Sequence, residues 1–266
     1  MSEPLVKVDD QGDRLIIENR NTTRRNALSP EYYQGLKSAL TTAASEPRIK
    51  VVILTAKGPF FCAGGDLNLL AERQYLPLED RAARIEALHE LIRLIRNCPK
   101  PVIAAVEGGA AGAGLSIALA CDFIVAAVGA KFSAAYVKAG LVPDGGLTST
   151  LTSLLPRALV SEICLTGQAV SAERFFNLGA INRLCPASQT LAVAQEIASG
   201  LAAGPSTTQA SIKALLTSAQ TTDPDTQLDV ERDAMAKAIA SPDAIEGIAA
   251  FLEKRMPDFN KAQENS

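Results

Sequence analysis

Residues 99–122 read PKPVIAAVEGGAAGAGLSIALACD, and this stretch decides the fold. It opens on a short, continuous apolar run, Pro101–Val106, which predicts a strand buried on both faces. A turn rich in Gly and Ala, Glu107–Gly114, follows directly, and helical sequence begins near Ala113. A strand, a turn and a helix in this order are typical of a parallel sheet covered by helices.

The flanking sequence repeats this alternation. Val51–Thr55 and Phe123–Ala127 are further apolar runs, and Leu15–Glu18 is a shorter one. A helix is predicted to begin at Pro30, because Ser29 can cap it and a proline at the first helical position loses no hydrogen bond. The chain up to about residue 195 is therefore expected to be α/β.

The sequence after about residue 195 is expected to be helical only. Four segments with helical spacing are separated by Gly-Pro, Asp-Pro and Ser-Pro breaks: Thr190–Ala203, Ser206–Ser218, Asp225–Ser241 and Asp243–Arg255. We therefore predict a core of residues 1–195 and a helical C-terminal region of residues 196–266. Because this region has too little apolar sequence to fold alone, we expect it to pack on the core or on a neighbouring subunit.

The composition excludes several classes of protein. The 266 residues are 47% hydrophobic and 21% charged, and 26 Lys and Arg against 29 Asp and Glu leave a net charge of −3. These values are ordinary for a soluble globular protein, and nucleic acid is not expected as a partner because no basic stripe occurs. Since no apolar run is long enough to span a bilayer and the N-terminus lacks an apolar signal core, we expect a cytoplasmic protein with no membrane partner.

The cysteines and the single histidine limit metal chemistry. Five cysteines, never spaced as CxxC, predict neither a disulfide framework nor a zinc ribbon. His89 is the only histidine, so this chain alone cannot form a site with several histidines. We expect no metal and no resident cofactor. His89 lies in an apolar stripe of a helix predicted around Arg81–Asn97, where a lone histidine is more often a core residue than a catalyst.

Two glycine-rich turns are candidate ligand sites. FFCAGGD (residues 60–66) follows one buried strand, and EGGAAGAG (residues 107–114) follows the next. Both would lie at the carboxyl ends of parallel strands, where ligands bind in α/β sheets. Because helix starts leave backbone N–H groups unpaired, the two turns could direct two donors at one oxygen. The alternative is close packing of helix on strand without a ligand.

Other motifs are absent, incomplete or ambiguous. Neither GxGxxG nor GxxxxGK[ST] occurs, so nucleotide binding is not predicted. GLSIA (residues 114–118) matches a GxSxG nucleophile elbow only in part, and His89 would precede Ser116 in the chain, which disfavours a serine hydrolase. Asp144, in GLVPDGG (residues 140–146), is either a catalytic carboxylate or the cap of a helix predicted over Leu147–Leu155.

Taken in order, these motifs resemble the enoyl-CoA hydratase/isomerase (crotonase) superfamily over residues 13–257. The segments that carry the resemblance are RRNALSPE (Arg24–Glu31), FCAGGDL (Phe61–Leu67), PKPVIAAVEGGAAGAGLSIALACD (Pro99–Asp122), AKFSAAYVKAGLVPDGG (Ala130–Gly146), LTG (Leu165–Gly167) and AFLEKR (Ala250–Arg255). The resemblance implies a spiral of ββα units with a C-terminal helical region, and a homotrimer or a hexamer built as a dimer of trimers. It also implies an acyl-CoA thioester as substrate, so that coenzyme A enters as part of the substrate.

The resemblance also implies roles for individual residues. The backbone N–H groups of Ala63 and Ala113 fall on the positions of an oxyanion hole that stabilises a thioester enolate. Residues expected to contact the substrate or CoA are Arg24, Arg25, Ala27, Ala63, Gly64, Gly65, Asp66, Leu67, Gly112 and Tyr136. Phe251 and Lys254 are expected to reach CoA from an adjacent subunit. The acyl pocket is expected to be shaped by Phe60, Leu69, Leu70, Tyr75, Tyr136 and residues 71–84.

The departures from the family pattern bear on the reaction. Hydratases of the family use two glutamates, and Ser116 and Tyr136 occupy those positions here. We therefore expect a double-bond shift in an unsaturated acyl-CoA, with Asp144 as the single catalytic acid–base, in preference to hydration. A hydrolytic enzyme resembling 4-chlorobenzoyl-CoA dehalogenase, with Asp144 as nucleophile and His89 as base, is the alternative. A non-enzymatic acyl-CoA-binding or RNA-binding member is disfavoured by an aspartate beside an oxyanion hole.

Overall fold

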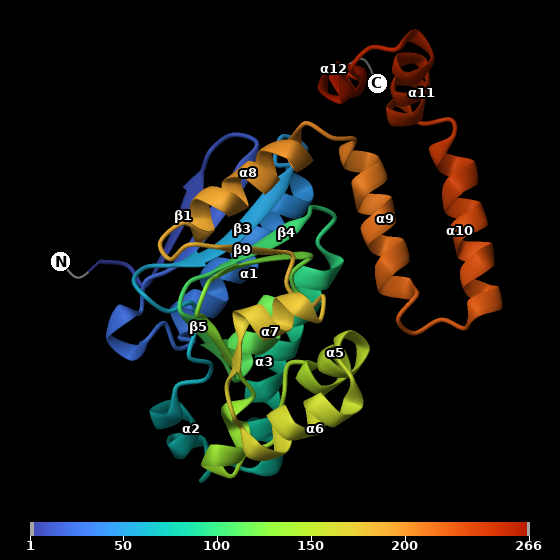
Figure 1. Ribbon diagram of the computed structural model, residues 1–266. Helices are drawn as coiled ribbons and strands as arrows, with labels where there is room; N and C mark the ends of the chain where they lie inside the picture. The colour runs from blue at the N-terminus through green and yellow to red at the C-terminus, as the bar shows by residue number, and fades with distance from the viewer. Residues whose placement is uncertain (1–2, 265–266) are drawn as a thin grey trace.

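A six-stranded sheet forms the centre of the computed structural model, which describes residues 3–264 (Figure 1). Its strand order is β1-β2-β3-β4-β6-β9. The strands are β1 (Val6–Asp10), β2 (Arg14–Asn19), β3 (Val51–Ala56), β4 (Val102–Val106), β6 (Phe123–Ala127) and β9 (Arg183–Cys185). All neighbours run parallel except β1, which is antiparallel to β2. The strands predicted from the apolar runs are thus confirmed.

A smaller sheet gives the chain its spiral path. It contains β5 (Gly109–Ala111), β7 (Lys131–Ser133) and β8 (Val170–Ser171), in the order β5-β7-β8. A strand of the large sheet is twice followed by a strand of the small one, β4 by β5 and β6 by β7. After β3, an isolated bridge between Cys62 and Ala110 takes the same place. Helices follow each of these pairs, so the expected spiral of ββα units is confirmed.

Helices cover both faces of the large sheet. The helices are α1 (Pro30–Ser45), α2 (Leu67–Arg73), α3 (Leu78–Asn97), α4 (Ala113–Ala120), α5 (Leu147–Leu154), α6 (Arg157–Thr166), α7 (Ala172–Asn177), α8 (Thr190–Ala202), α9 (Ser206–Ser218), α10 (Pro224–Ala238), α11 (Pro242–Glu253) and α12 (Phe259–Glu264), with short 3₁₀ turns η1 (Thr22–Arg24) and η2 (Ala135–Ala139). As predicted, α1 begins at Pro30, and the Ser29 hydroxyl accepts the Tyr32 N–H.

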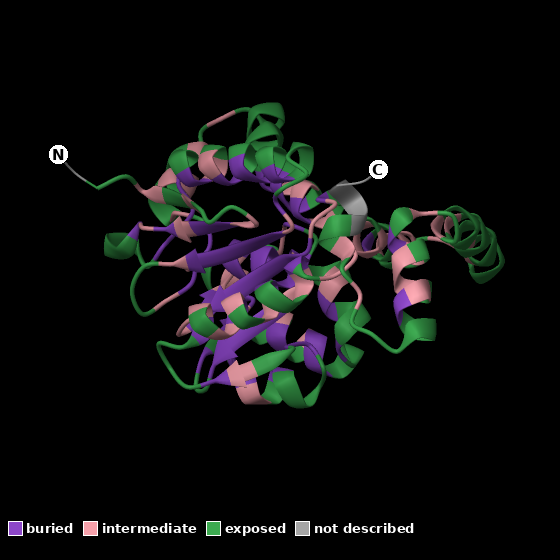
Figure 2. Ribbon diagram, turned by 90° about the horizontal axis from the view of Figure 1, so that it is seen from above, coloured by how far each residue is buried: buried purple, intermediate pink, exposed green. Residues whose placement is uncertain are grey.

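Alternate residues of the central strands pack into two separate apolar layers, one on each face of the large sheet. Ile53 and Ile103 pack with the alanines of α8 on one face. Val52 and Leu54 pack with α1, α3 and α4 on the other. Figure 2 shows the central strands almost entirely buried. Burial on both faces explains why these strands are continuous apolar runs without alternation.

The C-terminal region is helical from Thr190 onward. Because α8 packs on the sheet, the boundary drawn at residue 195 falls inside a helix that belongs to the core. α9, α10 and α11 extend away from the sheet, and α10 has no buried residue (Figure 1). α10 and α11 expose the apolar side chains of Leu228, Val230, Met235, Ile239, Ile245, Ile248, Phe251 and Leu252. None of the helices in the described range is long and apolar enough to cross a membrane.

A partly buried ion pair connects α9 to the core. The Lys213 ammonium lies 2.6 Å from Asp122 Oδ2 and also donates to the carbonyl oxygens of Ile95 and Lys100. Asp122 in turn accepts the backbone N–H of Val102 at 2.7 Å. These contacts use all three donors of the ammonium. This side chain therefore anchors the middle of α9 to the end of α3 and to the segments before β4 and β6.

Replacing Lys213 tests this role. We expect Lys213→Met to lower the free energy of unfolding by about 1–3 kcal/mol, because it leaves the partly buried Asp122 carboxylate without its counter-charge. Urea denaturation followed by circular dichroism measures the change. Lys237→Met, at an exposed position of α10, is the matched control and should leave the midpoint unchanged. Equal midpoints for the two variants would contradict the assigned role of Lys213.

Candidate active site

A cavity of about 460 Å³, here called the main cavity, opens beside the two glycine-rich turns. It is bounded by residues of α2, α3 and η2 and by the loop that precedes α5. Its lining is mostly apolar, and the charged side chains that reach it are those of Asp66, Arg73, Arg84, Lys138 and Asp144. Both predicted turns and the predicted catalytic aspartate therefore meet at one cavity.

The two glycine-rich turns are in backbone contact. The Ala111 N–H donates to the Cys62 carbonyl oxygen at 2.9 Å. A Cβ on Gly64, whose φ is +92°, would lie 2.7 Å from the Ala111 oxygen and 3.1 Å from the Ala113 nitrogen. A Cβ on Gly114 would lie 2.5 Å from the Cys62 oxygen. Only glycine fits at either position, because any side chain would separate the turns.

Each turn presents one unpaired backbone donor to the cavity. Ala113 is the first residue of α4, and a helix has no internal partner for the N–H at that position. Gly65 lies in the other turn, and both residues line the main cavity. Within the described residues, neither N–H donates to another group of the protein. Two donors, from the turns that follow two neighbouring strands, thus border the same cavity.

Ala63, which was expected to supply the first donor, does not. Its N–H donates to the Arg25 carbonyl oxygen at 3.1 Å. This expectation is therefore wrong, although Ala63 does line the cavity, as does Gly65. The Gly64 N–H is also occupied, since it donates to Cys62 Sγ at 3.4 Å, and the N–H that remains without a partner is that of Gly65.

Asp144 lines the main cavity and is held by two hydroxyl groups. The Tyr136 hydroxyl donates to Asp144 Oδ1 at 2.7 Å, and the Ser116 hydroxyl donates to the Asp144 backbone oxygen at 3.0 Å. Burial and the charge of Asp144 raise the pKa of Tyr136. The phenol therefore stays protonated at neutral pH and remains a donor. This role of Tyr136 was not anticipated from the sequence.

Two other ionisable groups near the turns are held neutral. Tyr33 of α1 lines the main cavity, and burial together with the charge of Asp144 raises the pKa of its phenol. Cys62 is buried between the turns, and burial raises the pKa of its thiol to about 12. Neither side chain is an anion at neutral pH. Tyr33 carries no sequence motif and was missed in the sequence analysis.

Both oxygens of Asp66, the other carboxylate of the cavity, already have a partner within the protein. Its Oδ1 accepts the Asn68 N–H at 2.9 Å, which caps α2, and its Oδ2 forms an ion pair with Arg24. Although burial opposes the charge, the Asn68 N–H and the Arg24 guanidinium hold the pKa of Asp66 below its ordinary value. Asp66 is therefore a fixed anion, with its oxygens committed to the start of α2.

His89 does not line the main cavity. Its neighbour Leu88 does, whereas His89 Nδ1 lies 3.3 Å from Glu86 Oε2. The expectation of His89 as a catalytic base is therefore not supported by its position. Successive side chains of an α-helix point in directions about 100° apart, so His89 points away from the cavity that Leu88 lines.

The loop Arg24–Ala27 borders the cavity and does not line it. The Arg25 guanidinium lies 4.2 Å from the centre of the Phe60 ring, and Asn26 Nδ2 donates to the Phe60 oxygen at 2.7 Å. Ala27 is buried. These contacts hold the loop against the first glycine-rich turn, with the exposed Arg24 reaching over Asp66.

Most of the other expected contact residues also fall at the main cavity. Those that line it are Gly65, Leu67, Leu69, Leu70, Gly112 and Tyr136, whereas Gly64, Phe60 and Tyr75 do not. Phe251 and Lys254 stand at the end of α11, far from the cavity of their own chain, and Phe251 is 83% exposed (Figure 1). The single chain thus does not bring these two residues to the site.

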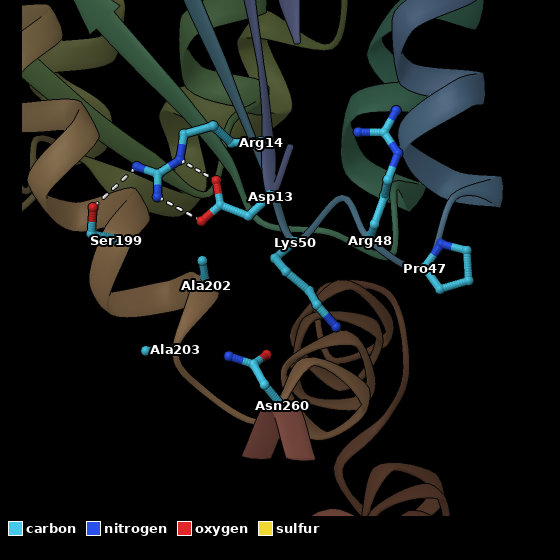
Figure 3. Close-up of a pocket in the computed structure, with 9 residues that line it drawn as sticks. All are labelled: Asp13, Arg14, Pro47, Arg48, Lys50, Ser199, Ala202, Ala203 and Asn260. Atoms are coloured by element: carbon cyan, nitrogen blue, oxygen red, sulfur yellow. Dashed lines mark hydrogen bonds and ion pairs between the residues drawn. The ribbon is translucent and has the colours of Figure 1, made fainter. Parts of the chain in front are cut away.

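A second, more open cavity of about 620 Å³ lies between β2, α8 and α12 (Figure 3). Two of its cations are already paired, Arg14 with Asp13 at 2.7 Å and Arg48 with Asp10 at 2.6 Å. It contains neither of the glycine-rich turns and no residue expected at the site. The candidate catalytic groups therefore lie at the main cavity and not at this second one.

Comparison with known proteins agrees with this geometry. The enoyl-CoA hydratase/isomerase family model matches residues 15–263. The 1,2-epoxyphenylacetyl-CoA isomerase of Escherichia coli K12 is 37% identical over 97% of this chain and 99% of its own length, and the 2,3-dehydroadipyl-CoA hydratase of the same strain is 33% identical with the same coverage. The crystal structure of an enoyl-CoA hydratase from Polaromonas sp. JS666 superposes on this structure with a TM-score of 0.92. The two sequences are 44% identical, and the match covers 95% of this chain and 98% of that one. Sequence, fold and site together place this chain in the enoyl-CoA hydratase/isomerase family.

Proposed function

We propose that this enzyme is an acyl-CoA isomerase that moves a double bond between carbons 3–4 and carbons 2–3 of an unsaturated acyl-CoA. One observation carries the proposal: among the described residues that line the main cavity, Asp144 is the one carboxylate not committed to an ion pair or a helix cap. A 1,3-shift of a proton needs one acid–base group, and a single free carboxylate supplies it.

The free N–H groups of Gly65 and Ala113 would form the oxyanion hole. Removing a proton next to a thioester places negative charge on the thioester oxygen, and two fixed backbone donors stabilise that charge without reorganising. Donors of this kind typically contribute about 10²–10³-fold each to the turnover number. The two donors lie in turns that follow separate strands, and this arrangement would fix the plane of the thioester relative to Asp144.

In this reaction Asp144 would remove a proton from carbon 2 and return it at carbon 4. The Tyr136 hydroxyl occupies Oδ1, so Oδ2 is the oxygen left for proton transfer. Because the Tyr136 phenol is held protonated, it stabilises the carboxylate without competing for the substrate proton. The same carboxylate can serve both carbons if they lie on the same side of the substrate chain.

Hydration is less well supported. It needs a second group to activate water, and the hydroxyls of Ser116 and Tyr136 both donate to Asp144. Relatives of this chain include proteins named as hydratases, and one at 37% identity is named as an isomerase. The hydrolytic alternative needs His89 as a base, and it is disfavoured because His89 does not line the main cavity.

The exposed helices of the C-terminal region support assembly as a homotrimer or a hexamer. α10 and α11 carry a row of exposed apolar side chains and extend away from the core (Figure 1). Such a surface is typical of a subunit interface. In the assembly, Phe251 and Lys254 would contact CoA bound mainly to the neighbouring subunit. The five cysteines, all free, fit a reducing cytoplasm.

Asp144→Asn tests the acid–base role. We expect turnover of a 3-enoyl-CoA to fall by about a thousandfold, because acid–base groups contribute roughly 10²–10⁴-fold, while the affinity for CoA stays the same. The matched control is Asp66→Asn, the same change at the other cavity carboxylate, which should alter KM more than kcat. Retention of most activity in Asp144→Asn, or faster hydration of crotonyl-CoA than isomerisation by the wild type, would contradict the proposal.

Removal of residues 243–266 tests the role of the C-terminal region. The truncated protein should be monomeric in light scattering coupled to size-exclusion chromatography, and its affinity for CoA should fall. Lys254→Ala should keep the assembly intact and weaken CoA binding by about tenfold, as expected for loss of a charge-assisted hydrogen bond. Lys237→Ala is the control for loss of a lysine from the same region. A truncated protein that stays trimeric and binds CoA normally would contradict the proposed assembly.

A further inference from the structure

Two arginines without a carboxylate partner line the main cavity. Arg73 is the last residue of α2, and Arg84 lies on α3. Neither guanidinium forms an ion pair or a hydrogen bond within the part of the chain that the structure describes. The other side chains of α3 that line the cavity, Ile85 and Leu88, are apolar. Arg73 is half-buried and Arg84 is exposed, and Lys138 of η2 is the third cation that lines the cavity. Guanidinium groups without a carboxylate partner, beside apolar side chains, can bind an anionic group of a ligand.

Both arginines lie beyond the reacting groups. Leu88 packs toward Gly145, the neighbour of Asp144, since a Cβ there would lie 3.2 Å from a Leu88 methyl group. Arg84 is one helical turn, about 6 Å, further along α3. Arg73 lies close enough to Tyr33 for the two to interact electrostatically, as does Asp144. The guanidiniums are therefore placed for the far end of an acyl chain whose thioester sits between the glycine-rich turns.

A third cavity continues the main one past these arginines. This side cavity, about 280 Å³ between α1 and α3, shares Tyr33, Arg73 and Arg84 with the main cavity. The carboxylate that lines it, Glu90, already faces Lys37 at 3.4 Å. The two arginines thus lie where the two cavities meet, with room for a ligand on either side. Within the described residues, neither guanidinium has a carboxylate partner.

We propose that the substrate is an acyl-CoA whose acyl chain ends in a carboxylate, and that Arg73 and Arg84 bind that carboxylate. The planar guanidinium matches a carboxylate with two parallel hydrogen bonds. This inference rests on the proposed function and narrows its substrate class. Arg73 and Arg84 are specificity-determining residues in this reaction, and Asp144 remains the group that moves the proton.

Binding of two non-reacting ligands tests the proposal without turnover. The ligands are hexanoyl-CoA and its counterpart in which the terminal methyl is replaced by a carboxylate, measured by calorimetry together with free CoA. We expect the wild type to favour the carboxylate ligand by about tenfold or more, as charge-assisted hydrogen bonds allow. Arg73→Met and Arg84→Met should each reduce that preference, and the double variant should abolish it, with hexanoyl-CoA binding kept within about threefold. Arg81→Met, at an exposed position of α3 outside both cavities, is the control and should retain the preference.

The outcomes separate this inference from the proposed function. Equal affinity of the wild type for both ligands would overturn the inference. Equal weakening of free CoA and both ligands in the arginine variants would also overturn it, because the guanidiniums would then serve the phosphates of CoA. Isomerisation of 3-hexenoyl-CoA, measured in parallel, reports on the proposed function alone. Loss of the preference for the carboxylate in the double variant, with the affinity for hexanoyl-CoA kept within about threefold, supports the inference.

Discussion

The backbone contact between two glycine-rich turns is the constraint on which the site depends. β3 and β4 are parallel neighbours, in register at Val52 and Val102, so the turns that follow them emerge at one edge of the sheet. Gly64 and Gly114 let those turns meet at van der Waals distance. Because the donors of the proposed oxyanion hole belong to the main chain, their separation is fixed by strand register and is independent of side-chain rotamers.

The same contact links the donors to the proposed acid–base. α4 begins with Ala113, and one turn later it carries Ser116, whose hydroxyl holds the Asp144 backbone. Gly145 packs directly on Ser116, since a Cβ there would lie 2.8 Å from the Ser116 Cβ. A single short helix, buried along its whole length, thus positions both the donor and the loop of the carboxylate. Rigid support of this kind keeps reacting groups within the small tolerances that proton transfer requires.

Much of the fold could be predicted because its signals are local. The apolar run Phe123–Ala127 is a strand with those same bounds, and Ser206–Ser218 is a helix with the predicted bounds. Buried parallel strands and proline-capped helices each have a sequence signature that does not depend on distant residues. The anchoring of α9 had no such signature, because it depends on Lys213 meeting Asp122 across 91 residues of chain.

The site was predicted less completely, for physical reasons. The motif FCAGGD marks a turn, but which of its N–H groups is free depends on a contact with a distant loop, because the Arg25 oxygen accepts the Ala63 N–H. The apolar stripe of α3 contains both Leu88 and His89, and only the rotation of the packed helix decides which of them faces the cavity. Tyr33 reaches the site solely through the packing of α1. Contacts between residues that are far apart in the sequence produce no local sequence pattern, so they could not be predicted from the sequence.

The central claim is that one carboxylate carries a proton between two carbons of the substrate. Isomerisation of a 3-enoyl-CoA labelled with deuterium at carbon 2, run in ordinary water to low conversion, tests it directly. If Asp144 alone transfers the proton, part of the label removed from carbon 2 will reappear at carbon 4 of the product, as read by nuclear magnetic resonance and mass spectrometry. Product that carries only solvent hydrogen at carbon 4, even at the lowest conversion and in the fastest turnover conditions, would contradict the claim.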